Sequence, residues 1–239
     1  MSIPRLYCSA TLAAGVEIAL TPAQAHHIGH VLRRAPGAEL RAFNATNGEF
    51  AAELIALRKD RGAMRIGERL REPAPEPELR ALIAALKREA MDWAVEKATE
   101  LGATSIQPVL TRRCVAERSN TERLTAIARA AAEQCERLSI PLLSDARPLH
   151  AVLDSWDGAP LLVAAERREA PSIHETLATL TTPCGFLVGP EGGFDRPELD
   201  DLARRPFVSL ATLGPRILRA ETALVAGLGA ISFALGARR

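Results

Sequence analysis

The chain of 239 residues lacks the features that mark metal-binding or secreted proteins. Its four cysteines lie far apart, without a C-x-x-C pair or the spacing of a zinc site, so we expect reduced thiols in a reducing compartment. Lys and Arg number 30 against 29 Asp and Glu, and the formal net charge of +1 gives no global field that would attract a polyanion. Any surface for nucleic acid must therefore be a local patch.

Targeting segments and long apolar runs are missing as well. The N-terminus has no basic stretch followed by an unbroken apolar run, so we expect no signal peptide. The most apolar segment, TALVAGLGAISFALGA, is shorter than the roughly 20 residues that a membrane span needs, which favours a buried helix. We therefore expect a cytoplasmic protein that is not inserted in a membrane.

A segment rich in proline and glutamate, EPAPEPE, divides the chain into two parts of different periodicity. Alternating Pro and Glu disfavours both helix and central strand, and we interpret the segment as an extended linker. Short alternating runs, one helical stretch and the hairpin signal Asn47-Gly48 precede it. The predicted domains are a small β-barrel over 1–72, a linker over 73–78 and a second domain over 79–239.

The second predicted domain alternates strands with helices. LRALIAAL, SIQPVL, APLLVAAE, CGFLVG and FVSLATLG are apolar runs typical of parallel strands that are covered on both faces. Amphipathic helices separate them, and Ser119-Asn120-Thr121-Glu122 has the pattern of a capping box that starts one of these helices. This alternation predicts an α/β fold with a mainly parallel sheet.

Two glycine-bearing loops follow predicted strands, GPEGGF at 189–194 and LGPRILRAET at 213–222. Open α/β sheets bind ligands at the carboxyl ends of their strands, and glycines allow a ligand to approach the backbone closely. The alternative is a tight turn before a helix, with Asp195 as its N-cap. Since neither a G-x-G-x-x-G nor a P-loop pattern is present, a dinucleotide fold or P-loop enzyme is disfavoured.

Taken together, GPEGGF and LGPRILRAETA resemble the paired cofactor loops of the SPOUT methyltransferases, and more narrowly those of the 16S ribosomal RNA (uracil-N3) methyltransferase family. IPRLY, HHIGHVLRRAPGAEL, KREAMDWAVEKATELGATSIQPVLTRRCVAER and AAAEQCER also occur in the family's order, so the resemblance covers nearly the whole chain. One departure is that the chain has fewer residues than the family usually carries between Arg118 and the helix predicted near Thr121.

The resemblance implies a fold, a cofactor and a substrate. It implies a PUA-like RNA-binding barrel followed by a methyltransferase domain with a C-terminal trefoil knot. The implied reaction is methylation of N3 of a uridine, number 1498 in the standard numbering of 16S ribosomal RNA, with S-adenosyl-L-methionine as the cofactor. It also implies a homodimer, in which the apolar C-terminal helix would gain cover from its twin. The RNA would be met within the assembled small ribosomal subunit.

The resemblance further implies which residues hold the cofactor. They come from the two glycine-bearing loops and the residues beside them. The first set is Leu187, Val188, Gly189, Glu191, Gly192 and Gly193, and the second is Leu213, Gly214, Ile217, Leu218 and Ala223.

Candidate catalytic residues follow from the chemistry of uracil. N3 is a poor nucleophile until it loses its proton, so the protein must supply alignment, proton removal and charge stabilisation. Arg216 and Arg219 are candidates for stabilising the uridine anion, and Arg219 also for binding phosphate. Glu191 and Glu221 are each either a base or the partner of an arginine, and Glu133 either reaches the site or is structural. No residue is assigned as the general base.

Arg33 and Arg34, at the end of the predicted helix in the first domain, are candidate RNA contacts, or alternatively cations that favour the helix terminus. Residues 1–72 carry 10 Lys and Arg against 7 Asp and Glu, a net charge of +3, which supports RNA contact through this domain. His26, His27 and His30 lie on the same helix without an evident partner ligand, so we expect no metal.

Two alternatives stay open. The first is a SPOUT enzyme that modifies a ribose 2′-oxygen or transfer RNA. The second is an RNA-binding factor in ribosome assembly that retains the fold without catalysis, although the intact glycine loops argue against it.

Overall fold

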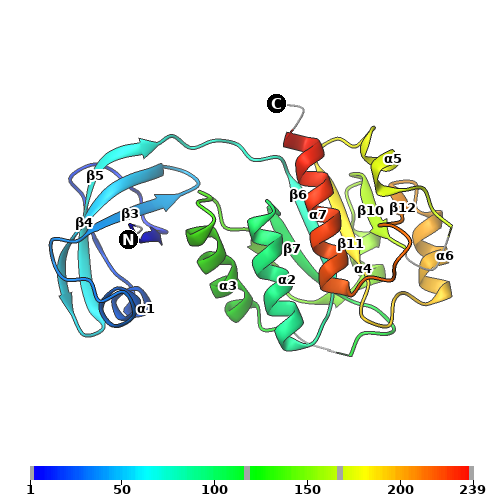
Figure 1. Ribbon diagram of the computed structural model, residues 1–239, viewed down its shortest axis with the longest axis horizontal. Helices are drawn as coiled ribbons and strands as arrows, with labels where there is room; N and C mark the ends of the chain where they lie inside the picture. Colours follow the sequence, from blue (N-terminus) through cyan, green and yellow to red (C-terminus); the bar gives the residue numbers. More distant parts are fainter. Residues whose placement is uncertain (1–2, 116–118, 166–168, 237–239) are drawn as a thin grey trace. The chain divides into compact units, whose positions relative to one another are not determined.

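The computed structural model describes residues 3–115, 119–165 and 169–236 (Figure 1). The shortened connection expected between Arg118 and the helix near Thr121 lies partly outside these residues. Among the helices that these ranges contain, none is long and apolar enough to cross a membrane.

The chain forms two compact units, and the first of them contains two separate stretches of sequence. It comprises Met1–Pro75 together with Ala132–Ile140, while the second unit comprises Glu76–Ala131 and Pro141–Arg239. The boundaries predicted from the sequence stay a prediction. The inclusion of Ala132–Ile140 in the first unit has no counterpart in the periodicity of the sequence.

A five-stranded sheet, in the order β1-β3-β4-β5-β2, forms the body of the first unit. Its strands are β1 (Arg5–Tyr7), β2 (Glu17–Ala19), β3 (Glu39–Asn44), β4 (Gly48–Arg58) and β5 (Arg61–Arg71). β1 and β3 are parallel, and the other neighbours are antiparallel. The predicted turn at Asn47-Gly48 joins β3 to β4, where Gly48 has a φ of +89°. A Cβ at Gly48 would lie 2.1 Å from the carbonyl oxygen of Arg71, so only glycine fits there.

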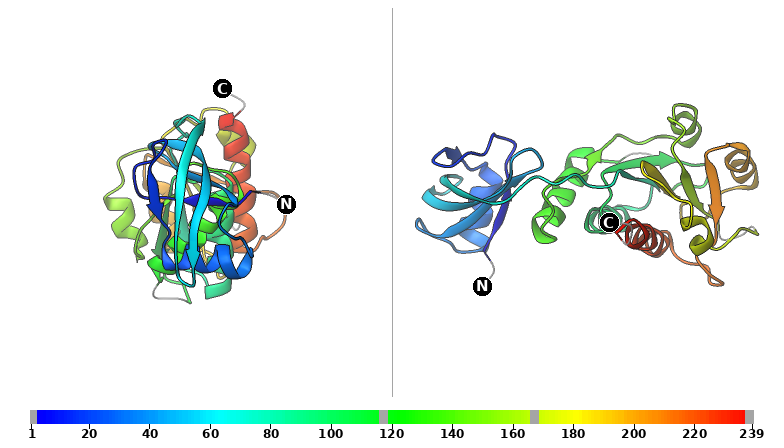
Figure 2. Two further views of the ribbon diagram at one scale, coloured as in Figure 1. Left: turned by 90° about the vertical axis from the view of Figure 1, so that its left-hand side faces the viewer. Right: turned by 90° about the horizontal axis from the view of Figure 1, so that it is seen from above.

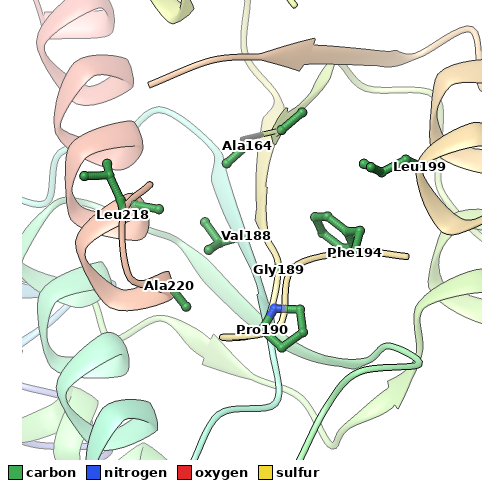
Figure 3. A pocket seen from close by; sticks show the side chains of 11 residues that line it. Ala164, Val188, Gly189, Pro190, Phe194, Leu199, Leu218 and Ala220 are labelled. Atoms are coloured by element: carbon green, nitrogen blue, oxygen red, sulfur yellow. The ribbon is translucent and has the colours of Figure 1, made fainter. Parts of the chain in front are cut away.

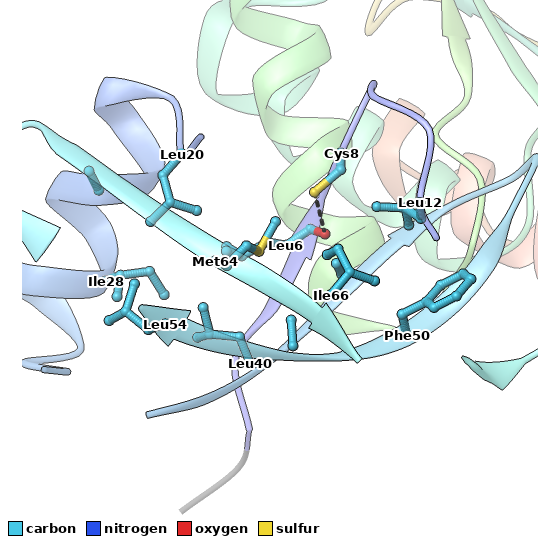
Figure 4. Packing of buried hydrophobic residues seen from close by; sticks show 13 residues of the cluster. Leu6, Cys8, Leu12, Leu20, Ile28, Leu40, Phe50, Leu54, Met64 and Ile66 are labelled. Atoms are coloured by element: carbon cyan, nitrogen blue, oxygen red, sulfur yellow. Dashed lines mark hydrogen bonds between the residues drawn. The ribbon is translucent and has the colours of Figure 1, made fainter. Parts of the chain in front are cut away.

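The predicted helix of the first domain is confirmed and packs on this sheet. α1 (Pro22–His26) begins with a capping box between Thr21 and Gln24 and continues into a π-helical turn, η1 (His27–Val31). Ile28 is fully buried, and Figure 4 shows it beside Leu54 in the core of the unit.

A seven-stranded, wholly parallel sheet forms the second unit, in the order β12-β10-β11-β6-β7-β8, with β9 also paired to β7. Its strands are β6 (Leu79–Ala84), β7 (Ser105–Leu110), β8 (Leu142–Leu143), β9 (Arg147–Pro148), β10 (Leu161–Ala164), β11 (Cys184–Val188) and β12 (Val208–Ala211). The helices are α2 (Arg88–Glu100), α3 (Thr121–Gln134), α4 (Leu149–Asp154), α5 (Ile173–Leu177), α6 (Arg196–Arg204) and α7 (Ala220–Gly236). Only the first part of α3, up to Ala131, belongs to this unit.

Helices cover both faces of the parallel sheet, with α2 and α7 on one face and α4 and α6 on the other (Figure 2). Strands such as β11 are therefore buried along their whole length, which is the physical reason for their continuous apolar sequences. Gly227 of α7 lies so close to the ring of Phe186 that a Cβ there would be 2.0 Å from it. The predicted α/β class with a small N-terminal β domain is confirmed, and the trefoil knot stays a prediction.

Two local features differ from the sequence-based expectation. The side chain of Asn120, rather than Ser119, accepts a hydrogen bond of 2.9 Å from the amide of Arg123 at the start of α3. The short elements β8, β9, α4 and α5 had no signal in the periodicity, because two to six residues span too little of a period to register.

One buried ion pair joins the two stretches of the first unit. Arg5 Nε donates to Glu49 Oε1 at 2.6 Å, and the two side chains are 5% and 0% exposed. The rest of the Arg5 guanidinium donates to the carbonyl oxygens of Ala132 and Glu133, both at 2.9 Å, and of Arg137 at 3.0 Å. The end of α3 and the turn after it are thereby fixed to β1.

We expect Glu49→Gln to lower the free energy of unfolding by about 3 kcal/mol, because it leaves the Arg5 charge buried without a counter-charge. Urea unfolding of the full chain, followed by circular dichroism, measures the change. Glu17→Gln is the matched control: the Glu17–Arg65 pair is more than half exposed on both sides, and its loss should cost less than about 1 kcal/mol. Equal losses for the two variants would contradict this account of the buried pair.

Candidate functional site

A pocket opens at the carboxyl ends of β10 and β11, beside the start of α7 (Figure 3). It holds about 440 Å³ of unfilled space, part of which is open to solvent. The wall consists of glycines and apolar residues. Its lining residues are Ala164, Ala165, Val188, Gly189, Pro190, Gly193, Phe194, Leu199, Leu218, Ala220 and Ala223.

The loop after β11 is tightly folded under the pocket. A Cβ at Gly189 would lie 3.0 Å from the Phe194 ring, so glycine permits this close packing. Gly193 has a φ of +67° and donates its amide to Pro190 O at 2.8 Å. Asp195 then caps α6 through a capping box with Glu198, as the sequence predicts for this N-cap. The loop is thus both a tight turn before a helix and a wall of the pocket.

The second predicted loop reaches the same place. A smaller cavity is lined by Thr212, Leu213, Gly214, Arg216 and by Ala164, Leu218 and Ala223, and the last three also line the main pocket. Gly214 has a φ of +116°, and its amide donates to Thr212 Oγ1 at 3.3 Å. The two glycine-bearing loops therefore converge on one site, although they are separate in the sequence.

The structure places the predicted cofactor residues in three groups. Val188, Gly189, Gly193, Leu218 and Ala223 line the main pocket, and Leu213 and Gly214 line the adjoining cavity. Leu187, Glu191, Gly192 and Ile217 line neither of these cavities: Leu187 is fully buried in the core, whereas Glu191 and Gly192 are exposed and Ile217 is 69% exposed. Their roles stay predictions.

The predicted charged residues differ in their surroundings. Arg216 lines the adjoining cavity, and Arg219, which directly precedes α7, is exposed. Glu221 is half-buried in the first turn of α7. Glu133 is held in the first unit, where its Oε1 accepts the amide of Tyr7 at 3.0 Å. This contact gives Glu133 a structural role.

The candidate RNA contacts Arg33 and Arg34 lie at the end of η1, in the first unit. Arg33 is exposed with a φ of +52°, and the amide of Arg34 donates to Ile28 O at 2.9 Å, which closes the helix end. The rings of His26 and His30 stack beside each other with centroids 4.8 Å apart. Within the described part of the chain, no group of three or more possible metal-binding side chains is found.

Sequence reasoning assigned no role to Arg112 and Arg113, which follow β7 and hold the loop after β11. Arg113 Nη1 donates to Gly192 O at 2.9 Å, and the amide of Arg112 donates to Glu198 Oε1 at 2.8 Å. Arg112 also pairs with Asp195 at 3.2 Å. Two arginines directly after a predicted parallel strand are the signal that could have found them, since parallel strands end at one edge of the sheet.

Two buried thiols do not supply a nucleophile at neutral pH. Burial raises the pKa of Cys8 to about 12, with a smaller contribution from the charge of Glu133. Burial likewise raises the pKa of Cys184 to about 11. Both thiols stay protonated and unreactive near neutral pH, and Cys184 lies at the start of β11, away from the pocket.

Known proteins are similar to this chain in sequence and in fold. Residues 73–232 match the family of RNA methyltransferase domains, and residues 20–62 match the RNA methyltransferase PUA domain. The Ribosomal RNA small subunit methyltransferase E of Rickettsia conorii is 34% identical, over 97% of this chain and 96% of its own. Its counterpart of the same name from Bacillus subtilis is 30% identical over 90% of this chain and 89% of its own.

A solved structure extends the similarity to three dimensions. The Ribosomal RNA small subunit methyltransferase E from Neisseria gonorrhoeae, crystallised with S-adenosyl methionine, has a TM-score of 0.85 and 28% identity, over 97% of this chain and 98% of its own. Fold and sequence thus define an RNA methyltransferase with a PUA-type N-terminal domain. More narrowly, the chain belongs to the ribosomal RNA small subunit methyltransferase E family. At the level of the family, this confirms the predicted enzyme class and S-adenosyl-L-methionine as its cofactor.

We expect Ala223→Leu to weaken the binding of S-adenosyl-L-methionine at least tenfold, because three added carbon atoms would occupy the main pocket. The helix itself tolerates leucine. Isothermal titration calorimetry measures the affinity. Ala226→Leu, one turn further along α7 and exposed, is the matched control and should bind like the wild type. Equal affinity of Ala223→Leu and the wild type would show that the cofactor does not bind in this pocket.

Proposed function

We propose that the chain transfers the methyl group of S-adenosyl-L-methionine to N3 of uridine 1498 in small-subunit ribosomal RNA. The observation that carries the proposal is the convergence of the two glycine-bearing loops on one pocket. Support also comes from relatives named for the methylation of small-subunit ribosomal RNA and from one that was crystallised with this cofactor.

The residues around the pocket suit such a cofactor. Val188, Leu218 and Ala223 offer an apolar wall, and Gly189 and Gly193 add wall positions without side chains, where a ligand can approach the backbone closely. The cofactor would supply an electrophilic methyl group. We propose that Leu187, Glu191, Gly192, Leu213, Gly214 and Ile217 complete its surroundings.

The protein must also stabilise the charge that uridine carries once N3 has lost its proton. Arg216 lines the adjoining cavity, and the exposed Arg219 lies between Leu218 and Ala220, two residues that line the main pocket. We propose that these two guanidinium groups bind the developing anion and the nearby phosphate. Glu191, exposed on the loop after β11, is the third proposed catalytic residue.

Further proposals concern partners and compartment. We propose that Arg33 and Arg34 bind phosphates of the RNA, and that the substrate is the assembled small ribosomal subunit in the cytoplasm. We also propose a homodimer, supported by Phe233 on α7 and Ile217 before it, which are 82% and 69% exposed. The proposed domain boundaries remain 1–72, 73–78 and 79–239.

Transfer of labelled methyl groups to ribosomal particles tests the reaction. Small subunits from cells that lack this activity are incubated with the protein and cofactor, the RNA is digested, and its nucleosides are separated by mass spectrometry. We expect 3-methyluridine, mapped to position 1498. Label on a ribose 2′-oxygen would favour the alternative SPOUT reaction, and binding without transfer would favour an assembly factor.

Neutralising Arg33 and Arg34 together tests the proposed RNA contact. If both bind phosphates, the double variant to Gln should lower the slope of log affinity against log salt by about 1.4 to 1.8, or roughly 0.7–0.9 for each phosphate. The affinity for S-adenosyl-L-methionine should stay the same. Arg196→Gln with Arg204→Gln, two exposed arginines of α6, gives a control with the same change in charge. An unaltered slope in the Arg33 and Arg34 variant would leave these residues only a role at the helix end.

A further inference from the structure

A second cavity lies at the carboxyl ends of β6 and β7, outside the cofactor pocket. It holds about 860 Å³ of unfilled space, part of which is open to solvent. Its wall comes from the ends of the two strands, from the first turn of α2 and from the start of α3. The lining residues are Ala85, Leu86, Arg88, Met91, Pro108, Ser119, Asn120 and Arg123.

This cavity is a neighbour of the cofactor pocket along the edge of the sheet. β6 pairs directly with β11, and Ile83 is opposite Val188 in the register. β6 ends one residue later at Ala84, level with Gly189, which lines the cofactor pocket, and the next residue, Ala85, lines the second cavity. Neighbouring strands are about 5 Å apart, so the two cavities lie at the ends of adjacent strands.

The charge of the lining is positive. Arg88 and Arg123 contribute two guanidinium groups, and none of the described residues that line the cavity is a carboxylate. Arg123 is paired with Asp92. The guanidinium of Arg88 is exposed and, in the part of the chain that the structure describes, makes no ion pair or hydrogen bond. One cation of the cavity is thus available for an anion from outside.

Hydrogen-bond donors in the same wall lack acceptors. α2, with 13 residues, begins at Arg88, and its N-cap residue Lys87 provides no side-chain cap, so the first-turn amides stay open for an anion. The hydroxyl oxygen of Ser119 is buried and finds no hydrogen-bond partner among the described residues. A buried hydroxyl without a partner is unfavourable, so a ligand that offers an acceptor oxygen would satisfy it.

The rest of the wall is apolar. Leu86, Met91 and Pro108 offer a surface without charge beside the two donors. A free inorganic anion would gain nothing from such a surface, whereas a nucleotide has an uncharged base or ribose attached to its phosphate. The combination favours a phosphodiester-linked nucleotide over a simple anion.

We propose that this cavity binds the RNA nucleotide next to the methylated uridine: Arg88 pairs with its phosphate, Ser119 donates a hydrogen bond to a phosphate oxygen, and the apolar wall contacts its base or ribose. The inference rests on the proposed function, because it takes RNA as the substrate. It adds a phosphate-binding site on the second unit to the contacts proposed for Arg33 and Arg34.

Arg88→Gln tests the phosphate contact. Since the bound phosphate takes no part in the methyl transfer, we expect the KM for small ribosomal subunits to rise about tenfold, with kcat within about twofold of the wild type. With a single-stranded RNA of about 20 nucleotides around the target, the salt slope should fall by about 0.7, one phosphate contact. Arg204→Gln, at an exposed position of α6, is the matched control and should leave KM and slope unchanged.

Ser119→Ala separates a ligand contact from a structural role. Its hydroxyl has no partner within the described chain, so its removal should leave the melting temperature unchanged or higher, while RNA affinity falls severalfold. A lower melting temperature with unchanged RNA affinity would show a structural hydroxyl and overturn this part of the proposal.

The outcomes distinguish this inference from the proposed reaction. If the wild type methylates N3 and Arg88→Gln leaves both KM and salt slope unchanged, the phosphate site is wrong and the reaction stands. If the wild type binds RNA with a slope that depends on Arg88 but leaves N3 unmethylated, the reaction is wrong and the site stands. A change in subunit mass of Arg88→Gln in light scattering would show an interface between copies and overturn the proposal.

Discussion

The guanidinium of Arg5 is the group on which the first unit depends, because it joins the sheet to a segment 127 residues later in the chain. Its charge is compensated by Glu49, and its remaining donors satisfy three carbonyl oxygens at and after the end of α3. A buried cation requires all of these partners at once, since each missing partner would leave a desolvated charge. Arg5 thereby holds the turn after α3, together with the Tyr7 amide, which donates to Glu133, and Arg71, which donates to Glu136 O at 2.9 Å.

In the second unit, the parallel direction of the strands determines where the site forms. Because β6, β7, β10, β11 and β12 all run the same way, their carboxyl ends and the loops that follow lie along one edge. Two loops with glycines form the pocket there, the arginines after β7 hold one of these loops, and the cavity beside α2 adjoins it. The proposed cofactor and RNA sites are thus neighbours because of strand order.

Glycine and apolar residues line the pocket. The arginines near it differ in whether their guanidinium groups already have hydrogen-bond partners. Arg113 is engaged with the carbonyl of Gly192, whereas Arg88 in the neighbouring cavity has no partner among the described residues. A guanidinium that braces a loop contributes geometry, and one that stays open can meet a phosphate. This difference depends on contacts, and a sequence shows only that both residues are arginine.

The sequence by itself determined the α/β class, the Asn47-Gly48 turn, the N-cap Asp195 and the two glycine-bearing loops, because each depends on local periodicity or backbone conformation. Tertiary structure alone decided which of those residues meet. It placed Leu187 in the core and left Ile217 exposed, although Leu187 lies just before the first glycine-bearing loop and Ile217 lies within the second. It also brought Ala132–Ile140 to the first unit. Such contacts depend on the order of the strands in the sheet and on the pairing of buried charges. Neither of these produces a periodic pattern in the sequence.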